Sequence, residues 1–337
     1  MTSPLDRLGR GLADLRLSVT DRCNLRCTYC MPRELFGANH EFLPRSEILT
    51  YEEFARLVTV FAGLGVSKVR LTGGEPLLRR DLETLVSSIA RTPGITDVAI
   101  TTNGTLLAAR AGALREAGLH RVTVSLDSVD PTTFAAMGDT KVPLSVVLAG
   151  IEVAVKAGFT PIKLNAVVQR GVNDDGIVDL ARYAREGGHI LRFIEYMDVG
   201  SSNGWTSADV VPASEILARI AEAHPIRQLA PSRPGEVARR WGYEDGRGEI
   251  GVITSVSQPF CGDCTRARIT STGELFTCLF ASRGTDLRAL LRSGASDDEL
   301  HTAISAVWTA RDDRYSEQRQ QLLPLEVRRA EMSYLGG

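Results

Sequence analysis

Short β-rich segments alternate with helical segments between residues 15 and 197 of the chain. Six segments rich in β-branched residues are expected to be strands: Leu15–Thr20, Lys68–Thr72, Val98–Thr102, Val122–Asp127, Ile162–Val168 and Ile190–Met197. Five segments between them carry apolar residues at helical spacing: Tyr51–Leu64, Asp81–Arg91, Leu106–Ala117, Leu144–Ala157 and Gly176–Glu186. This alternation predicts a parallel sheet with right-handed crossovers, either a doubly wound sheet or a partial barrel.

The polar positions within these strands favour the barrel. Arg16 and Ser18 alternate with apolar residues in the first strand, and Arg70, Ser125 and Lys163 lie in similar patterns later in the chain. Because side chains of a strand point alternately to its two faces, each strand has one polar face. Parallel strands covered by helices on both faces would be almost wholly apolar. We therefore predict an α/β fold, an incomplete (βα)6 TIM-like barrel with a polar, concave lumen. The alternative is that some strands are exposed edges.

The pattern changes after Asp198. Residues 198–250 are rich in Gly, Ser and Pro, with one helix expected near Ala213–Ala223. Residues 248–280 resemble short strands around three cysteines, and helices are expected near Asp286–Arg292 and Asp297–Ala310. We accordingly divide the chain into a barrel, residues 1–198, and a C-terminal α+β extension, residues 199–337.

Composition and charge exclude several classes of protein. The 337 residues are 43% hydrophobic and 24% charged with a formal net charge of −2, so no global basic field attracts nucleic acid or an anionic membrane. The longest apolar stretch, Pro143–Val155, is shorter than the ~20 residues of a membrane span. The first residues include Asp6, Arg10 and Asp14 and lack the apolar core of a signal peptide. We expect a cytoplasmic protein whose six cysteines are not a disulfide framework.

The six cysteines form two triplets. The first follows the first predicted strand as C-x3-C-x2-C, and the second lies far along the chain as C-x2-C-x13-C. They are Cys23, Cys27 and Cys30, and Cys261, Cys264 and Cys278. Three thiolates per site can hold a four-iron cluster and leave one iron open to a non-protein ligand. Structural zinc usually takes four Cys or His ligands, and no histidine lies in or close beside either triplet. Zinc, most of all at the second triplet, and inert thiols stay open as alternatives.

Two motifs resemble those of radical S-adenosylmethionine enzymes. One is the first triplet, with the aromatic Tyr29 before its last cysteine; the other is Gly73–Pro76, which resembles the superfamily's GGEP motif at a strand end. The resemblance implies that S-adenosylmethionine chelates the open iron of a 4Fe-4S cluster and yields a 5′-deoxyadenosyl radical on reduction. Without the triplet, Gly-Gly before Pro would indicate only a turn.

Further motifs resemble the GTP 3′,8-cyclase family, the molybdenum cofactor biosynthesis protein A. They are Arg192–Met197, Gly235–Ala238, Ile253–Ser257, Cys261–Arg268, Arg311–Glu317 and the terminal Gly336–Gly337, and the resemblance runs from about residue 12 to residue 337. It implies a lyase that abstracts the 3′ hydrogen of GTP. The product would be (8S)-3′,8-cyclo-7,8-dihydroguanosine 5′-triphosphate, a precursor in molybdenum cofactor biosynthesis.

The resemblance also implies roles for single residues. The first triplet would hold the reducing 4Fe-4S cluster, and the second triplet a second 4Fe-4S cluster that contacts guanine. Residues expected at S-adenosylmethionine are Tyr29, Gly74, Glu75, Ser125 and Met197. Residues expected at GTP are Arg16, Arg70, Thr101, Lys163, Arg192, Arg266 and Arg268. Arg16 and the tail residues Gly336 and Gly337 are also expected to take part in catalysis, the tail by entering the pocket.

The residue types suit a triphosphate independently of the resemblance. Arginine forks bind phosphate oxygens in pairs, and lysine supplies a point charge. Arg266 and Arg268 are two residues apart and would share one face of a strand. The chain has no G-x4-G-K-[ST] loop, so GTP recognition cannot depend on that motif. The alternative is that each arginine reaches solvent or pairs with a surface carboxylate.

Implied partners are a reductant such as flavodoxin or ferredoxin and the downstream cyclic pyranopterin monophosphate synthase, the family's C subunit. A homodimer is considered, and no nucleic acid or membrane partner is expected. Three other functions stay open at this point: a radical enzyme that modifies a peptide and carries an auxiliary cluster, a non-enzymatic zinc-binding module, and a dithiol oxidoreductase. The last is disfavoured because a triplet leaves one thiol unpaired.

Overall fold

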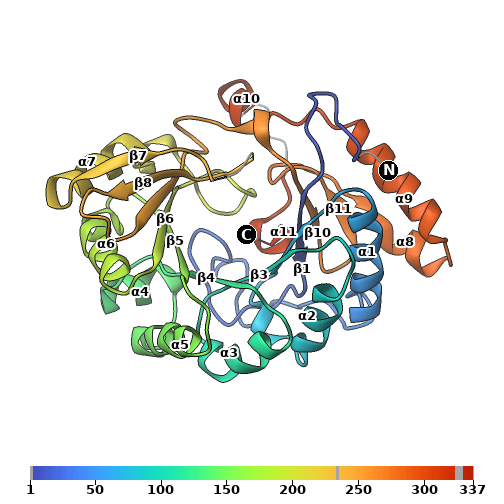
Figure 1. The fold of residues 1–337 in the computed structure, drawn as a ribbon, viewed down its shortest axis with the longest axis horizontal. Helices are drawn as coiled ribbons and strands as arrows, with labels where there is room; N and C mark the ends of the chain where they lie inside the picture. The colour runs from blue at the N-terminus through green and yellow to red at the C-terminus, as the bar shows by residue number, and fades with distance from the viewer. Residues whose placement is uncertain (1–2, 233–234, 323–328, 337) are drawn as a thin grey trace.

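A single twelve-stranded sheet curves into an open barrel, and helices α1 to α6 cover its outer side (Figure 1). The structure is a computed structural model that describes residues 3–232, 235–322 and 329–336. The order of the strands is β12-β11-β10-β1-β2-β3-β4-β5-β6-β9-β8-β7. Within the described ranges no pairing joins β12 to β7, so the barrel stays open at one side.

The central strands and helices lie where the hydrophobic pattern predicts them. The strands are β1 (Asp14–Ser18), β2 (Lys68–Thr72), β3 (Asp97–Thr102), β4 (Arg121–Ser125), β5 (Lys163–Val168) and β6 (Ile190–Glu195). The helices are α1 (Tyr51–Gly63), α2 (Leu82–Ala90), α3 (Leu107–Glu116), α5 (Leu144–Lys156) and α6 (Ile177–Glu186). All neighbouring pairs from β1 to β6 are parallel, as βαβ units require. Between β1 and β6 the sequence pattern missed one α-helix, α4 (Pro131–Gly138), which Asp130 caps by accepting a bond from the Thr133 N–H.

The two faces of the strands differ as expected. Leu15 and Leu17 of β1 are fully buried and belong to the core beneath the helices. Arg16, between them, lines the interior cavity together with Arg70 of β2. The polar face of the strands therefore lines the lumen, and burial of the apolar face against helices holds the barrel together.

The C-terminal part of the chain extends the same sheet at both edges. Beyond β6 lie β9 (Glu249–Ile253), β8 (Arg239–Tyr243) and β7 (Ile226–Leu229), with α7 (Ala213–Ala223) before them in the chain. Beyond β1 lie β10 (Arg266–Ile269), β11 (Glu274–Phe276) and β12 (Thr285–Asp286). The remaining helices are α8 (Leu287–Arg292), α9 (Asp297–Thr309), α10 (Tyr315–Leu322) and α11 (Met332–Leu335). A partial barrel with an α+β extension is thus confirmed, although β7 and β8 were not predicted as strands.

The extension contributes strands to the wall of the barrel. β9 pairs parallel with β6, and β10 pairs parallel with β1, so both strands continue the barrel wall. Helix α11, close to the C-terminus, lies inside the ring of strands (Figure 1). The division at residue 198 stays a prediction, because both parts share one sheet. Among the described helices, none is long and apolar enough to cross a membrane.

Candidate active site

All six cysteines line one cavity inside the barrel. The cavity volume is about 2020 Å³, counted out to the open mouth. Its lining also includes Arg16, Arg70 and Arg268 on the inner faces of β1, β2 and β10.

The first triplet lies on the loop that follows β1. Burial raises the pKa of Cys23 to about 11 and that of Cys30 to about 12, and it also raises the pKa of Cys27. The Arg26 guanidinium fixes this loop by donating to the Cys23 carbonyl at 2.8 Å. Nδ2 of Asn103, at the end of β3, lies 3.8 Å from the Cys23 sulfur. Three partly buried thiols that line one cavity fit the donor set of a cluster with one open iron.

Two glycines after β2 let its end approach the cysteine loop. The Gly74 N–H donates to the Thr20 carbonyl at 2.8 Å. A Cβ at Gly73 would lie 2.6 Å from the Thr20 oxygen, and a Cβ at Gly74 would overlap the Arg22 carbonyl. Gly73 also has φ +146°, which favours glycine. Both glycines line the cavity, so the GGEP segment forms part of its wall.

Glu75 lies behind this wall rather than in the cavity lining. Its carboxylate accepts bonds from the Leu77 N–H at 3.0 Å, the Thr102 hydroxyl at 2.8 Å and the Asn103 N–H at 2.7 Å. Burial raises its pKa to about 7, although these bonds act in the opposite direction. We expected Glu75 at S-adenosylmethionine; its contacts instead make it a positioning residue for the ends of β2 and β3.

The other residues expected at S-adenosylmethionine, Tyr29, Gly74, Ser125 and Met197, all line the cavity. The Tyr29 hydroxyl donates to Oδ2 of Asp127 at 2.8 Å. Burial raises the pKa of Asp127 to about 6, while the bonds from Tyr29 and the Val167 N–H lower it. Asp127 follows β4 at the carboxyl edge of the sheet, and that position was the one sequence signal that could have identified it.

The second triplet lies at the other end of the strands. Cys264 comes just before β10, which pairs parallel with β1, whereas the first triplet follows the carboxyl end of β1. Burial raises the pKa of Cys264, but the charges of Arg266 and Arg311 outweigh burial and bring it to about 6. Burial raises the pKa of Cys278 to about 12. Three partly buried thiols that line one cavity, with the pKa of Cys264 lowered, fit the same kind of cluster as the first triplet.

Three arginines form a row across adjacent strands between the two triplets. The register pairs Arg16 of β1 with Arg268 of β10 on one side and with Arg70 of β2 on the other. Burial and the charges of neighbouring arginines lower the pKa of Arg16 to about 9 and that of Arg268 as well. Nε of Arg16 is buried and has no hydrogen-bond partner among the described residues. Such a row is unfavourable unless an anion accompanies it.

A second row lies one step below the first. The register pairs Asp14 of β1 with Arg266 of β10 and with Lys68 of β2. Burial would raise the pKa of Asp14, but the charges of Lys68 and Arg16 hold it well below its usual range. Arg266 also lies over the Phe260 ring, 5.5 Å from its centroid. This row contains its own carboxylate, so the arginine row above it has the greater need for an anion.

The remaining residues expected at GTP lie on β3, β5 and β6. Thr101 lines the cavity and accepts a bond from Nη1 of Arg70 at 2.9 Å. Arg192 lines the cavity and lies 3.8 Å from the Glu236 carboxylate. Lys163 is not part of the cavity lining. Burial, followed by the charges of Arg192 and other nearby cations, lowers its pKa to about 7.

The C-terminal tail enters the barrel. Nη1 of Arg268 donates to the Gly336 carbonyl at 2.8 Å. Gly336 has φ +72°, and a Cβ there would overlap the Thr72 hydroxyl and lie 3.2 Å from Cβ of Ser18. Gly337 lies outside the described residues. Gly336 thus contacts Arg268, which lines the cavity, but Gly336 is not itself part of the lining, and entry of the tail into the pocket stays a prediction.

One further polar residue of the lining, Asn165, was not among the expected site residues. It lies on β5, and the register places it between Ser125 of β4 and Arg192 of β6. Its Oδ1 is buried and has no hydrogen-bond partner within the described part of the chain. Its place on the polar face of β5 was the sequence signal that could have identified it.

Two family profiles match successive parts of the chain. The profile of the Radical SAM superfamily matches residues 17–184, and the profile of Molybdenum Cofactor Synthesis C matches residues 189–317.

Curated relatives match nearly the whole chain. GTP 3′,8-cyclase of Acidothermus cellulolyticus is 61% identical over 95% of this chain and 90% of its own length. GTP 3′,8-cyclase of Xanthomonas axonopodis pv. citri is 48% identical over 100% of both chains. The enzyme of the same name from Staphylococcus saprophyticus is 46% identical over 98% of both.

Solved structures share the fold at low sequence identity. Streptococcus suis SuiB bound to S-adenosylmethionine superposes with a TM-score of 0.61 and 16% identity, over 87% of this chain and 68% of that one. SuiB crystallised in a second structure gives a TM-score of 0.59, also at 16% identity, over 92% of this chain and 68% of that one.

Proposed function

The chain belongs to the GTP 3′,8-cyclase family of the radical S-adenosylmethionine superfamily, and on that premise we propose how its cavity divides between cofactors and substrate. The reaction is the cyclisation of GTP through C3′ of its ribose and C8 of its guanine, within molybdenum cofactor biosynthesis. The cofactors are S-adenosylmethionine and a 4Fe-4S cluster. The second cluster, the binding residues and the partners belong to the proposal.

The first triplet and the carboxyl edge of the sheet form the cofactor end. Cys23, Cys27 and Cys30 hold the cluster, and S-adenosylmethionine lies against Tyr29, Gly74, Ser125 and Met197, which line the same part of the wall. When bound, this pair supplies the one-electron chemistry that removes hydrogen from C3′. Asp127 holds the Tyr29 hydroxyl, and Glu75 holds Asn103 beside Cys23. These residues fix the geometry of the site and do not take part in bond breaking.

GTP lies between the two triplets. The triphosphate is bound by Arg16, Arg70 and Arg268, aided by Arg266 and Arg192, while the base reaches a second 4Fe-4S cluster on Cys261, Cys264 and Cys278. The step from Ser18 to Asp14 along β1 spans ~13 Å at the usual rise of a strand, a distance suited to part of a nucleotide. Lys163 supplies charge from behind the wall. The observation that carries this assignment is the register of Arg268, Arg16 and Arg70.

The assignment is tested with anaerobically reconstituted protein, a reductant, S-adenosylmethionine and 3′-deuterated GTP. Deuterium is expected in 5′-deoxyadenosine. Cys27→Ala should abolish cleavage of S-adenosylmethionine, whereas Cys264→Ala should retain part of the cleavage and lose cyclisation. Equal loss of cleavage in both variants would contradict the division of roles between the triplets, and absence of label would contradict abstraction from C3′.

The proposal also includes partner proteins, a cellular location and an oligomeric state. A reductant of the flavodoxin or ferredoxin type supplies the electron, and the C-subunit synthase consumes the product. A cytoplasmic location suits both the thiol ligands and the nucleotide substrate. A homodimer is tested by sedimentation of the reconstituted protein.

A further inference from the structure

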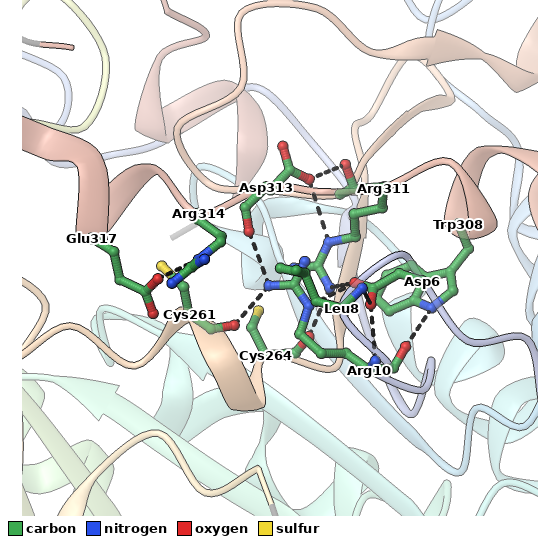
Figure 2. Close-up of polar contacts among 11 residues, drawn as sticks. Asp6, Leu8, Arg10, Cys261, Cys264, Trp308, Arg311, Asp313, Arg314 and Glu317 are labelled. Atoms are coloured by element: carbon green, nitrogen blue, oxygen red, sulfur yellow. Dashed lines mark hydrogen bonds and ion pairs between the residues drawn. The ribbon is translucent and has the colours of Figure 1, made fainter. Parts of the chain in front are cut away.

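A buried network of charged side chains contacts the main chain of the second triplet (Figure 2). Asp6 and Arg10 belong to a turn before β1, and Arg311 belongs to the loop between α9 and α10. The Asp6, Arg10 and Arg311 side chains are 0%, 2% and 1% exposed. Burial of charge to this extent is costly unless each group is paired and hydrogen-bonded.

Asp6 is the centre of the network. Its Oδ1 accepts the main-chain N–H groups of Leu8 and Arg10, each at 2.9 Å, and so closes its own turn. Its Oδ2 accepts Nε of Arg10 at 2.6 Å and Nη1 of Arg311 at 3.1 Å. One carboxylate thus joins two guanidinium groups that are about 300 residues apart in the sequence.

Both guanidinium groups also hold main-chain carbonyls of the triplet. Nη1 of Arg10 donates to the Cys261 carbonyl at 2.7 Å and to the Asp313 carbonyl at 2.9 Å. Nη1 of Arg311 donates to the Cys264 carbonyl at 2.8 Å. The segment that they hold is one short 3₁₀ turn, Cys261–Asp263, which has little regular structure of its own.

Trp308 fixes the two arginines from the side of α9. Its indole Nε1 donates to the Arg10 carbonyl at 3.0 Å. The Arg311 guanidinium lies over the same indole, 4.5 Å from its ring centroid. The arginines therefore have few alternative positions, as a rigid support for a ligand loop requires.

We propose that Asp6, Arg10 and Arg311 are positioning residues for the second triplet. They hold the carbonyls of Cys261 and Cys264, which fixes the turn whose thiols line the cavity. The turn before β1 is therefore part of the second iron–sulfur site, although it contributes no ligand. This inference rests on the second cluster of the proposed function.

The most informative variant is Asp6→Asn, because the Asn side chain has the same size and shape as that of Asp. Asn keeps an acceptor for the turn but presents an NH2 group to the two guanidinium donors in place of Oδ2. The matched control is Asp312→Asn, which makes the same change in an exposed pair with Arg7 in the neighbouring segment. Arg10→Lys is the second variant. It keeps the positive charge but loses the fork that reaches the Cys261 carbonyl.

Each variant is characterised by two measurements. The first is iron and sulfide content after anaerobic reconstitution, together with cleavage of S-adenosylmethionine as the readout of the first cluster. The second uses the cluster-free protein and follows alkylation of each cysteine by peptide mass spectrometry. This second readout is independent of activity and of metal.

We expect about eight irons per chain for the unaltered protein and for Asp312→Asn, and about four for Asp6→Asn, with cleavage retained. Alkylation of Cys261 and Cys264 should be about tenfold faster in Asp6→Asn, because the turn opens more often. The alkylation rate of the first triplet should be unchanged. Arg10→Lys should give the same selective pattern.

Three results would overturn the proposal or its premise. Unchanged iron content and unchanged alkylation in Asp6→Asn would show that the network does not position the triplet. Equal loss at both triplets would show only a general structural role. About four irons in the unaltered protein would refute the second cluster, while the alkylation comparison would still decide whether Asp6 positions the thiols.

Discussion

Arg268 donates a hydrogen bond to the main-chain carbonyl of Gly336 at 2.8 Å, inside the barrel. Arg268 is 3% exposed and lies beside Arg16 in the register of β10 and β1. The carbonyl oxygen brings partial negative charge to a row of buried cations that has no carboxylate of its own. Under the proposed assignment of Arg268 to the triphosphate, the tail of the GTP-free protein supplies part of what a phosphate oxygen would supply.

Gly336→Ala should displace the tail. The left-handed backbone costs alanine about 1 kcal/mol, and the new Cβ would overlap Thr72 as well. Gly246→Ala is the control, because Gly246 has φ +76° but nothing within 4 Å of the added Cβ. We expect cyclisation to fall at least ~10-fold in Gly336→Ala only, with faster amide exchange over residues 329–336. The same activity in both variants would remove Gly336 from the catalytic assignment.

Arg266→Ala should weaken GTP binding and leave S-adenosylmethionine binding unchanged. Loss of one charge-assisted contact costs about 2 kcal/mol, which is roughly 30-fold in Kd. Arg239→Ala, on the exposed part of β8 next to Gln258, is the control. Titration calorimetry of both ligands measures the effect. Parallel weakening of both ligands would indicate damage to the fold instead of a lost phosphate contact.

The sequence predicts the polar lumen because strand periodicity is a local property. Arg16 and Arg70 each lie between apolar residues, and that alternation alone assigns them to one face. It does not assign register. That Arg268 is the neighbour of Arg16 follows only from the pairing of β10 with β1, across more than 200 residues of chain. Tertiary pairing of this kind leaves no local pattern.

Residues that act through other residues were the hardest to recognise. Asp6 and Arg10 suggested only a charged N-terminal segment, and nothing local indicates that both become buried. Glu75 was assigned to the cofactor with its motif, whereas its carboxylate binds main-chain N–H groups. β7 and β8 were missed because β7 is stabilised by pairing with β8, and β8 by pairing with β9, at an edge of the sheet.

Glu75→Gln should loosen the first triplet without touching a ligand. The Gln amide keeps one acceptor but turns an NH2 toward the Leu77, Thr102 or Asn103 donors, at a cost of about 1–3 kcal/mol for a buried donor left unpaired. Urea unfolding of the cluster-free protein and the Kd of S-adenosylmethionine measure the two effects. Glu83→Gln, which breaks a half-exposed pair with Arg110, is the control. An unchanged Kd in a destabilised Glu75→Gln would limit Glu75 to folding.

Lys163 should take up a proton when GTP binds. Its pKa of about 7, lowered from 10.5 by burial and nearby cations, leaves the amine mostly neutral at pH 8. A triphosphate would favour the ammonium and raise the pKa, so binding at pH 8 should consume up to about 0.9 proton, and at pH 6 the amine should contribute almost none. Calorimetry in buffers of different ionisation enthalpy measures the uptake.

The control variant is Lys163→Arg, whose guanidinium keeps its charge throughout this pH range. This variant should bind GTP without taking up the proton. Equal uptake in Lys163→Arg would assign the proton to another group, and no uptake in the unaltered protein would place GTP away from Lys163.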